Sequence, residues 1–427
     1  MTGTKLQYGD VPIGEAPANW GKVKVDDNLV QVLGGFSCAR TKTVPAGVPH
    51  LRPMNVATNG EVVLTADTQY VRPDFRADLE DYYLQPGDLL FNNTNSVELV
   101  GKTAIVRKPM AVAFSNHINR LRVKDPNNVD PRWLALALRS LQEQGFFATH
   151  SNKWIGQAGF SVSALARVDI PIPFPDDPVR SLPTQQRIVA RIEALFAELR
   201  ECRKLHQAVV EDTNRLMEAV RNELFLELET RVSTSKFDAV AESRLGKMLS
   251  QQSRTGEYQR PYLRNANVLW DDFGLDDLYR MNFSPDEQEI YRVLPGDLLI
   301  CEGGEIGRTA VWEGQLDEVY FQKALHRARL RNPNASPRYL MHFMAWVAKN
   351  GAIARLMTGA ALPHLTGIKL KTLDVIWPDP DIQSEIVYYL DSVAGEIEAM
   401  HDANRSDEKL LAQMERAILA QAFRGEL

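Results

Sequence analysis

The chain lacks long apolar runs and closely spaced cysteines, and each absence excludes a class of protein. No stretch approaches the roughly eighteen uncharged apolar residues of a membrane span, and Met1 to Asp10 lacks the pattern of a secretory signal. The three cysteines, Cys38, Cys202 and Cys301, lie far apart. This spacing argues against a zinc site or a disulfide framework and fits a reducing compartment. We therefore expect a cytoplasmic protein that binds no metal and makes no membrane contact.

Sequence motifs of catalysis are also missing. There is no phosphate-binding G-x-x-x-x-G-K-[ST] loop, no H-E-x-x-H helix, no G-x-S-x-G elbow and no Pro-Pro dipeptide, which the N-P-P-F or D-P-P-Y loop of amino-methyltransferases needs. Residues 302–307 resemble a nucleotide-binding loop, but a strand-like run follows them instead of a helix. They therefore predict a hairpin or a recognition loop. We expect no enzymatic activity and no cofactor in this chain.

The formal net charge is only -6, which argues against binding nucleic acid through bulk charge. Residues 381–427 alone hold ten acidic residues and four Lys or Arg, so this segment accounts for the whole excess. The remainder is balanced and leaves two readings open: local basic faces for a polyanion, or a plain mixed surface.

The sequence repeats itself with a period near 200 residues. Several short motifs recur in the same order. The matched pairs are Pro49 to Val56 with Pro261 to Val268, Leu84 to Leu90 with Val293 to Leu299, Gly101 to Ile105 with Gly307 to Val311, and Pro131 to Leu134 with Pro337 to Leu340. Each Pro-Gly-Asp within the second pair predicts a β-turn that leads into a strand. The chain therefore carries two copies of one mixed α and β unit.

Each copy ends in a long amphipathic segment, residues 184–228 and 381–427. Apolar residues there alternate by three and four, which predicts a heptad seam on a helix of roughly 60 Å. The first seam is Ile188, Ile192, Leu195, Leu199, Cys202, His206, Val209, Thr213, Leu216 and Val220, and the second is Ile386, Leu390, Val393, Ile397, Met400, Asn404, Asp407, Leu411, Met414 and Ile418. The polar members His206, Thr213, Asn404 and Asp407 would meet if the helices pair antiparallel. They either fix the register or hydrate the middle of the pair.

Taken together, these features resemble the specificity (S) subunit of type I DNA restriction-modification systems, over nearly the whole chain. The resemblance rests on Ala18 to Trp20, the paired Leu-Arg…Asn-Val and Pro-Gly-Asp-Leu-Leu motifs, the Gly-Lys/Arg-Thr-Ala loops and the C-terminal Ala422 to Leu427. The second copy departs from it, since it lacks the initial Trp and has Ile-Gln-Ser-Glu where the first helix has Gln-Gln-Arg.

The resemblance implies an α+β fold with two mixed α/β target recognition domains, residues 1–183 and 229–380. They are joined by helices 184–228 and 381–427, which pair as an antiparallel coiled coil. It further implies a non-catalytic subunit whose two domains each read one half of a bipartite asymmetric site on double-stranded DNA. Two methylation (M) subunits would dock on it and bring S-adenosylmethionine, and restriction (R) subunits would join them.

Candidate DNA-facing residues follow from residue type and position. In the first domain Asn92, Asn93 and Asn95 follow a predicted strand and precede Lys102, and asparagine can bond adenine bidentately. A plain surface turn explains the same asparagines. The matching loop of the second domain offers Glu302, Glu305 and Arg308, which suit cytosine, guanine or phosphate. Arg52 and Arg264 occur in both copies and predict either a phosphate contact or a fold-supporting bond. Further candidates are Lys153, His364 and Lys369.

Two other functions remain open from the sequence. One is a stand-alone DNA-binding regulator with tandem recognition domains, which would bind its site without a partner. The other is a coiled-coil scaffold that does not contact DNA.

Overall fold

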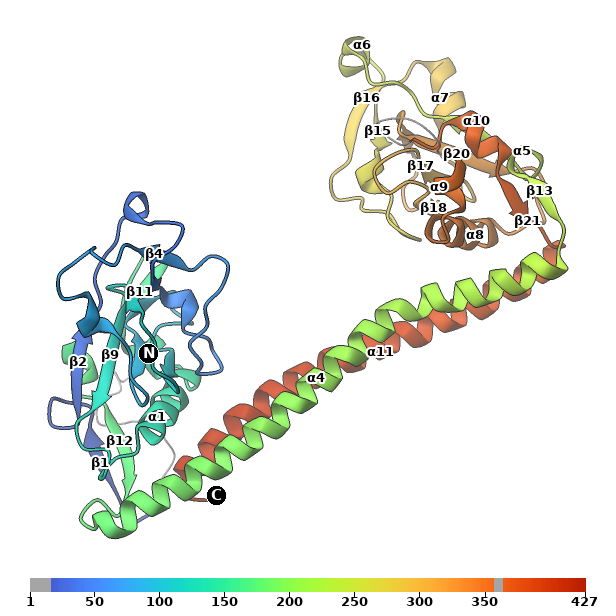
Figure 1. Ribbon diagram of the computed structural model, residues 1–427. Helices are drawn as coiled ribbons and strands as arrows, with labels where there is room; N and C mark the ends of the chain where they lie inside the picture. The colour runs from blue at the N-terminus through green and yellow to red at the C-terminus, as the bar shows by residue number, and fades with distance from the viewer. Residues whose placement is uncertain (1–16, 357–363) are drawn as a thin grey trace, which may run out of the picture. The chain divides into compact units, whose positions relative to one another are not determined.

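A computed structural model describes residues 17–356 and 364–427, so the expectation made for Met1 to Asp10 lies outside the described residues. The chain divides into two compact units: unit 1 comprises Met1–His206 and Ser406–Leu427, and unit 2 comprises Gln207–Arg405. Two long helices, α4 (Pro178–Arg231) and α11 (Pro380–Phe423), each contribute residues to both units (Figure 1). Within the described ranges no helix is long and apolar enough to cross a bilayer.

In its described residues, unit 1 has four small sheets with strand orders β2-β9-β5-β7, β4-β3-β8, β10-β11-β6 and β1-β12. Its strands are β1 (Trp20–Lys24), β2 (Val30–Gly34), β3 (Val48–Leu51), β4 (Gln69–Val71), β5 (Leu89–Asn92), β6 (Thr94–Asn95), β7 (Thr103–Ile105), β8 (Ala113–Phe114), β9 (Ile118–Val123), β10 (Asn152–Trp154), β11 (Gln157–Gly159) and β12 (Asp169–Pro173). Its helices besides the long pair are η1 (Arg40–Lys42), η2 (Pro53–Asn55), η3 (Leu79–Tyr82), α1 (Pro131–Glu143), α2 (Phe146–His150) and α3 (Val162–Leu165).

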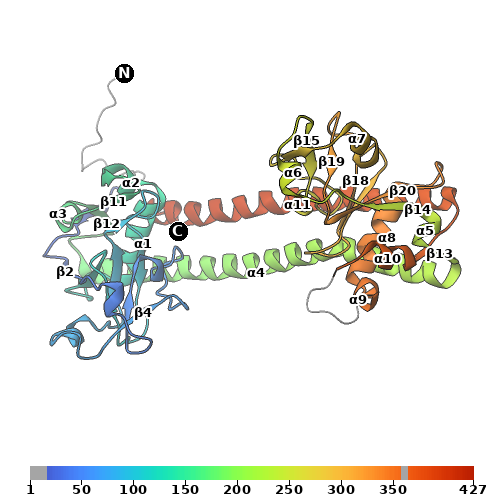
Figure 2. The same cartoon turned by 90° about the horizontal axis from the view of Figure 1, so that it is seen from above.

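Outside residues 357–363, unit 2 has three sheets with strand orders β14-β20-β17-β18, β16-β15-β19 and β13-β21. Its strands are β13 (Thr234–Lys236), β14 (Ala241–Leu245), β15 (Gln259–Leu263), β16 (Tyr279–Asn282), β17 (Leu298–Cys301), β18 (Thr309–Val311), β19 (Tyr320–Phe321), β20 (Leu325–Leu330) and β21 (Asp374–Ile376). Its shorter helices are α5 (Phe237–Val240), α6 (Gln251–Arg254), η4 (Asn265–Asn267), α7 (Pro285–Tyr291), α8 (Pro337–Lys349), α9 (Ala352–Leu356) and α10 (Gly367–Thr372). Helices α6 and α7 lie with β15, at the far end of the unit from β13 and α5 (Figure 2).

The sequence repeat corresponds to a structural repeat. The four-stranded sheets match strand for strand. In each, three antiparallel strands (β2-β9-β5 or β14-β20-β17) are followed at the edge by the strand that begins within the Gly-Lys/Arg-Thr-Ala motif, β7 or β18. The β3–β8 pair and the β15–β19 pair are both parallel. Among the described residues, only the sheet β10-β11-β6 of unit 1 lacks a counterpart in unit 2.

The Pro-Gly-Asp turns form as the sequence predicts. Gly87 and Gly296 have φ of 90° and 89°, a region that glycine enters without steric penalty. The following aspartates are buried, and Asp88 accepts a hydrogen bond from the Gln85 amide at 2.7 Å. Asp88 also forms a bidentate pair with Arg122, at 2.6 and 2.7 Å.

Unit 2 repeats this arrangement with other residues. Asp297 accepts from the Leu294 amide at 2.7 Å and pairs with Arg329 through two bonds of 2.7 Å. Each Asp–Arg pair joins the turn before β5 or β17 to the neighbouring strand of the same sheet, β9 or β20. Burying a carboxylate is costly unless charged hydrogen-bond partners compensate for its lost hydration. Both Asp–Arg pairs therefore hold the turn and the neighbouring strand in a fixed relation.

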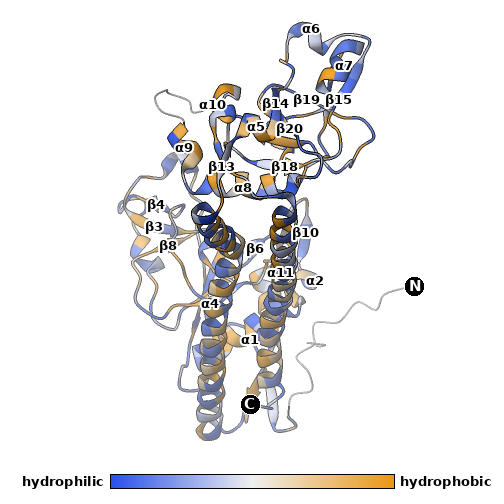
Figure 3. Cartoon of the chain, turned by 90° about the vertical axis from the view of Figure 1, so that its right-hand side faces the viewer, coloured by the Kyte–Doolittle hydropathy of each residue, from blue (hydrophilic) through white to orange (hydrophobic). Residues whose placement is uncertain are grey.

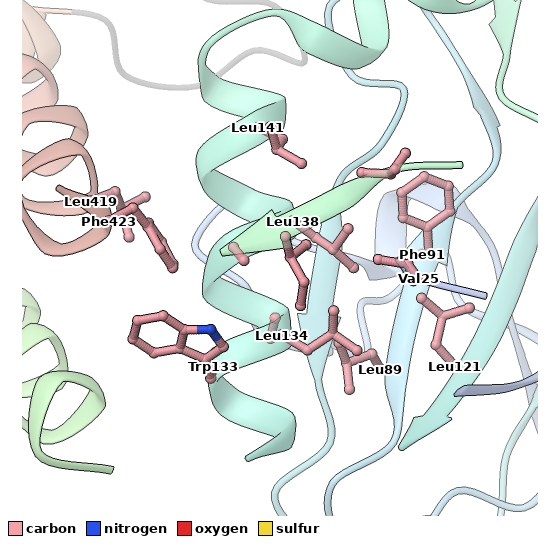
Figure 4. Packing of buried hydrophobic residues seen from close by; sticks show 14 of the residues in the cluster. Val25, Leu89, Phe91, Leu121, Trp133, Leu134, Leu138, Leu141, Leu419 and Phe423 are labelled. Carbon is pink, nitrogen blue, oxygen red and sulfur yellow. The ribbon is translucent and has the colours of Figure 1, made fainter. Parts of the chain in front are cut away.

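Helix α1 packs on the four-stranded sheet of unit 1. Its start is set by Pro131 at the first turn and by Asp130, whose side chain accepts from the Arg132 amide. Leu134, Leu138 and Leu141 then recur on one face and point toward strand residues that include Leu89, Phe91 and Leu121 (Figure 4). Helix α8 of unit 2 begins in a similar way: Ser336 caps it by accepting from the Tyr339 amide, and Pro337 is its first residue.

The ends of the long helices complete these cores. The ring of Phe423 meets Trp133 edge to face at 4.9 Å in unit 1 (Figure 4). In unit 2 the ring of Phe225 stacks on Trp346 at 5.2 Å and also contacts Tyr339. Both phenylalanines are fully buried. Each is therefore a core residue of a unit whose sheets come from the other copy of the sequence repeat.

Only part of the predicted seam is buried. Ile188, Ile192, Leu199 and Thr213 of α4 are buried as expected, but five predicted seam residues of the two helices are exposed. The exposed five are Cys202, Val209, Met400, Asp407 and Met414. At Val209, Met400 and Met414 the prediction was wrong by one position, because the next residue along each helix is the half-buried one. Val209 and Val210 are both valine, so spacing and hydrophobicity alone do not decide which of them faces inward. Apolar and polar segments alternate along both helices (Figure 3).

The remaining polar seam residues differ in their surroundings. His206 and Asn404 are half-buried, and the Thr213 hydroxyl donates to the Val209 carbonyl of its own helix at 2.8 Å. Helix α4 also starts earlier than predicted, at Pro178, so Pro183 lies inside it. Proline is tolerated in the first helical turn, where backbone amides have no intrahelical partner. Pro183 is the sixth residue of α4, just beyond that turn, so the Val179 carbonyl lacks its usual backbone N–H donor.

An ionic cluster joins α8 to both long helices in unit 2. His342 is buried on α8, and its Nδ1 accepts from Arg221 of α4 at 3.1 Å. Arg338, one turn earlier, donates to Asp391 of α11 at 2.8 Å and to Asp271 at 3.0 Å. Burial, followed by the positive charges of Arg221 and Arg338, lowers the pKa of His342 to about 3, and Asp391 offsets this only in part.

This pKa predicts a pH-dependent stability. Between pH about 6.5 and 3 the unfolded chain binds a proton at His342 that the folded chain does not, so the free energy of unfolding falls as the pH falls through that window. The contribution has a slope of up to about 1.4 kcal/mol per pH unit. The variant His342→Gln retains an acceptor for Arg221 and should show a shallower pH dependence in denaturant unfolding. The exposed His364→Gln is the control and should follow the wild type; an equally steep profile for His342→Gln would contradict the assignment.

Candidate nucleic-acid interface

The two Leu-Arg…Asn motifs form the same short turn, η2 in unit 1 and η4 in unit 2. The backbone amide of Arg52 donates to the Asn55 side chain at 2.8 Å, and that of Arg264 donates to Asn267 at 2.9 Å. Both asparagines are buried and donate in turn to backbone carbonyls. Arg264 further pairs with Asp277 at 2.8 Å. Of the two roles left open, the pair with Asp277 supports the structural one for Arg264. The Arg52 guanidinium makes a longer bond, to the Cys38 carbonyl at 3.5 Å, so both roles stay open for Arg52.

Lys102 and Arg308 are structurally equivalent, and both tie the loop that carries them to this turn. Lys102 is buried and donates to the carbonyls of Pro53 and Val56 at 3.2 and 2.7 Å. Arg308 donates to the carbonyl of Asn265, the residue that matches Pro53, at 2.9 Å. Burial lowers the pKa of Lys102. Neither the ammonium nor this guanidinium nitrogen is turned outward to a ligand.

The three asparagines after β5 differ in accessibility. Asn92 ends β5 fully buried and donates to the Pro53 carbonyl at 3.2 Å, so its amide is not accessible to a ligand. Asn93 is half-buried and donates to the Asn119 side chain at 2.9 Å. Asn95 is half-buried in β6, where its side-chain oxygen accepts from the Ser96 amide at 2.9 Å. The expected loop therefore contains the short strand β6, and Asn93 before it and Asn95 within it are the accessible amides.

Strand β6 forms the edge of the sheet β10-β11-β6. Asn95 lies opposite Ala158 of β11, and β11 pairs with β10 through Lys153 opposite the same alanine. Lys153 is exposed. The structure thus brings Asn95 and Lys153 into one small sheet, although they are far apart in sequence.

The corresponding loop of unit 2 connects β17 to β18, as the predicted hairpin. Glu305 is exposed and accepts from the indole of Trp270 at 2.7 Å and from Arg308 at 3.2 Å, with the Lys349 ammonium at 3.9 Å. Glu302 is half-buried at the start of the same loop. The loop therefore presents a carboxylate that accepts from two donors and lies near one lysine ammonium, where unit 1 presents amides.

His364 and Lys369 lie at the start of α10, near this loop. His364 is exposed, and its ring packs against Gly303. A Cβ atom added to Gly303 would lie 3.1 Å from Nδ1 of His364. Thr366 caps the helix by accepting from the Lys369 amide, and the Lys369 side chain is half-buried. His364 therefore adjoins Gly303, the residue after Glu302, while Lys369 is placed by the helix cap.

The described residues contain no group of three or more His, Cys, Asp or Glu arranged to hold a metal ion, and all three cysteines are free thiols. Sequence reasoning missed Trp154, Ile155 and Gln157, which extend the sheet of Asn95 and Lys153 outward. One sequence signal was available: residues 144–168 contain no Asp or Glu, although the chain has 55.

Comparison with known proteins identifies relatives of this arrangement. The family model for the type I restriction modification DNA specificity domain matches residues 52–209. A putative type I restriction enzyme MjaX specificity subunit from Methanocaldococcus jannaschii is 27% identical over 162 residues, which cover 38% of this chain and 37% of that protein. The type I restriction enzyme EcoKI specificity subunit of Escherichia coli K12 is 23% identical over 373 residues, 82% of this chain and 76% of that protein.

Solved structures share the fold. The HsdS subunit from Thermoanaerobacter tengcongensis aligns with a TM-score of 0.59 at 19% identity and covers 96% of this chain and 98% of that one. A chain from a study of complex assembly and conformational transition of the type I R-M system aligns with a TM-score of 0.67 at 18% identity, covering 97% and 100%.

The geometry predicts opposite effects for two lysines of unit 1. Lys102→Met leaves two buried carbonyls without their donor, so it should lower the free energy of unfolding by about 1–3 kcal/mol. Lys153→Met should leave stability unchanged, because Lys153 is exposed, and should weaken DNA binding with a smaller dependence on salt. Denaturant unfolding and DNA titration at several salt concentrations measure both. Equal stability losses would contradict the division of roles.

Proposed function

Because the chain belongs to the type I restriction-modification specificity subunits, we propose that it selects the DNA sequence on which a multisubunit methyltransferase and endonuclease acts. In this proposal each recognition domain reads one half of a bipartite, asymmetric site on double-stranded DNA. The chain itself is non-catalytic, and S-adenosylmethionine binds on the partner methylation subunits.

One observation supports the proposal: the two units share the same structural frame, but the residues that follow its equivalent strands β5 and β17 differ. The frame is the buried Asp–Arg pair and the Arg…Asn turn, present in both units. At the end of the equivalent strands, unit 1 presents Asn93 and Asn95, and unit 2 presents Glu305 beside Trp270. Amides and carboxylates offer different donors and acceptors to base edges. Two equivalent frames would dock alike and read different sequences.

We assign recognition to residues 1–183 and 229–380, and spacing to residues 184–228 and 381–427 as an antiparallel coiled coil. Contacts inside unit 1 support this direction of pairing. Arg203 of α4 donates to Glu415 of α11 at 2.7 Å, and Arg187, more than four turns earlier on α4, donates to the Leu427 carbonyl at 3.4 Å. Residue numbers thus fall along one helix as they rise along the other.

The charge distribution supports partners other than DNA for the long helices. The acidic segment 381–427 would be repelled by phosphates, which leaves it for two methylation subunits and, through them, the restriction subunits. The near-neutral remainder implies that partners supply much of the nonspecific affinity. A stand-alone regulator is the alternative, and it would bind its site tightly without partners.

Genome-wide mapping of N6-methyladenine tests the proposal. Cells that express this chain together with its adenine methylation subunit should acquire one bipartite methylated motif. The motif should be absent with either protein alone, and the purified chain should show no methyltransferase, nuclease or ATPase activity. Methylation at the same motif without this chain would contradict the proposal.

Isosteric changes should separate the two half-sites. Asn95→Asp keeps the oxygen that accepts from Ser96 and removes the amide donor, so it should relax or change the half-site of unit 1 alone. Glu305→Gln keeps an acceptor for Trp270 and should alter only the other half-site. A lost base contact is worth about 1–3 kcal/mol.

Asn127→Asp, at an exposed turn of unit 1, is the matched control, and methylome sequencing reads all three variants. Loss at both half-sites in either variant would indicate failed assembly. An unchanged motif in both would remove these residues from the interface.

The helices should act as a ruler between half-sites. One heptad inserted in both helices at matched positions lengthens the pair by about 10 Å, or roughly three base pairs. The methylated motif should keep its half-sites and gain that spacer. A folded, active insertion variant with an unchanged spacer would contradict this role, and insertion in one helix only should abolish assembly.

A further inference from the structure

Unit 1 carries a projecting β-hairpin made of β10 and β11. Trp154 pairs with Gln157, so the turn consists of Ile155 and Gly156 alone. Gly156 has φ of 74°, which allows this tight reversal. The hairpin is anchored through β11 to β6, the strand of Asn95. The matching stretch of the second repeat runs through residues 357–363, which lie outside the described residues.

The tip of the hairpin is apolar and exposed. Ile155 has a relative exposure of 102%, the highest among the large apolar side chains of the described residues. Trp154 beside it is 50% exposed and fixed in place, since its indole donates to Gln157 at 3.0 Å and its ring covers Gly159. An added Cβ on Gly159 would lie 2.6 Å from that ring. Contacts of Trp154 with Gln157 and Gly159 therefore hold the hairpin in place while Ile155 at its tip stays exposed.

The surroundings of the hairpin suit a polyanion. Residues 144–168 contain no acidic residue, and Lys153 is exposed on β10. A cavity of about 260 Å³ at the base of the hairpin is lined by the amides of Asn93, Asn119 and Asn152, the hydroxyls of Thr94 and Ser161, and apolar groups, with no ionisable side chain. An apolar tip on an acid-free, amide-rich surface matches a groove with phosphates at its rim and base edges at its floor.

We propose that this hairpin enters the major groove as a two-stranded ribbon and that Ile155 reads the C5-methyl group of a thymine in the half-site of unit 1. The major groove admits a two-stranded β-ribbon, and the thymine methyl is the apolar feature of its floor. Lys153 contacts the phosphates beside it. The inference rests on the proposed function and adds a specificity-determining residue to it. A protein partner fits less well, because one two-residue turn offers far less than the roughly 800 Å² of a stable protein interface.

The test uses the full chain assembled with its methylation subunits and duplexes that carry the methylated motif. Each thymine of the two half-sites is replaced singly by deoxyuridine, which removes only the methyl group. One substitution, in the half-site of unit 1, should weaken wild-type binding about three- to fivefold, the effect of one buried methyl. The Ile155→Ala complex should bind the thymine duplex more weakly by a similar or larger factor and show no further loss with deoxyuridine.

Val179→Ala provides a matched control, because Val179 is 84% exposed and apolar but lies at the start of α4. It should retain the full response to deoxyuridine. A half-site without a thymine, or the same sensitivity in Ile155→Ala as in the wild type, would overturn the inference. So would loss of methylation subunits from the Ile155→Ala complex, because the tip would then contact protein. If the wild-type complex shows no sequence preference at all, the proposed function itself fails.

Discussion

Two phenylalanines at the ends of the long helices determine how the chain can fold. Helix α11 follows the second sequence repeat, yet its Phe423 packs on Trp133 in the first unit. Helix α4 follows the first repeat, yet its Phe225 packs on Trp346 in the second. Neither repeat completes its core from contiguous residues, which is why unit 1 joins Met1–His206 to Ser406–Leu427. Removing a buried ring of this size leaves a cavity that typically destabilises a protein by about 3–5 kcal/mol.

The shared frame leaves only a small part of each unit free to differ. The Asp88–Arg122 and Asp297–Arg329 pairs and the equivalent bonds of Lys102 and Arg308 hold the same strands in both units. Differences concentrate beyond these bonds, at amide side chains in unit 1 and around Glu305 in unit 2. This separation of a rigid scaffold from a variable edge is the arrangement that sequence-specific readout requires.

The sequence predicted features that depend on local chemistry and missed those that depend on packing. The repeat, the Pro-Gly-Asp turns and the starts of α1 and α8 follow from glycine, proline and capping residues, and all are present. The phase of the helix seam was wrong in part, because only packing distinguishes exposed Val209 from half-buried Val210. Asn92 and Lys102 look like surface groups in sequence, but the carbonyl of Pro53, 39 and 49 residues away, draws both inward. The hairpin of Ile155 gave no strand signal, because its strands are three residues each.

In the proposed function each unit reads one half-site on its own, within a common frame. The most direct measurement is the methylome of a chimaera in which residues 20–177 are replaced by residues 234–379, so that both units derive from the second repeat. The equivalent packing of Phe225 and Phe423 and the equivalent positions of these segments before α4 and α11 make the exchange structurally reasonable. The chimaera should methylate a motif with two identical half-sites, each equal to the wild-type half-site of unit 2. An active chimaera that still methylates a motif with two different half-sites would contradict it.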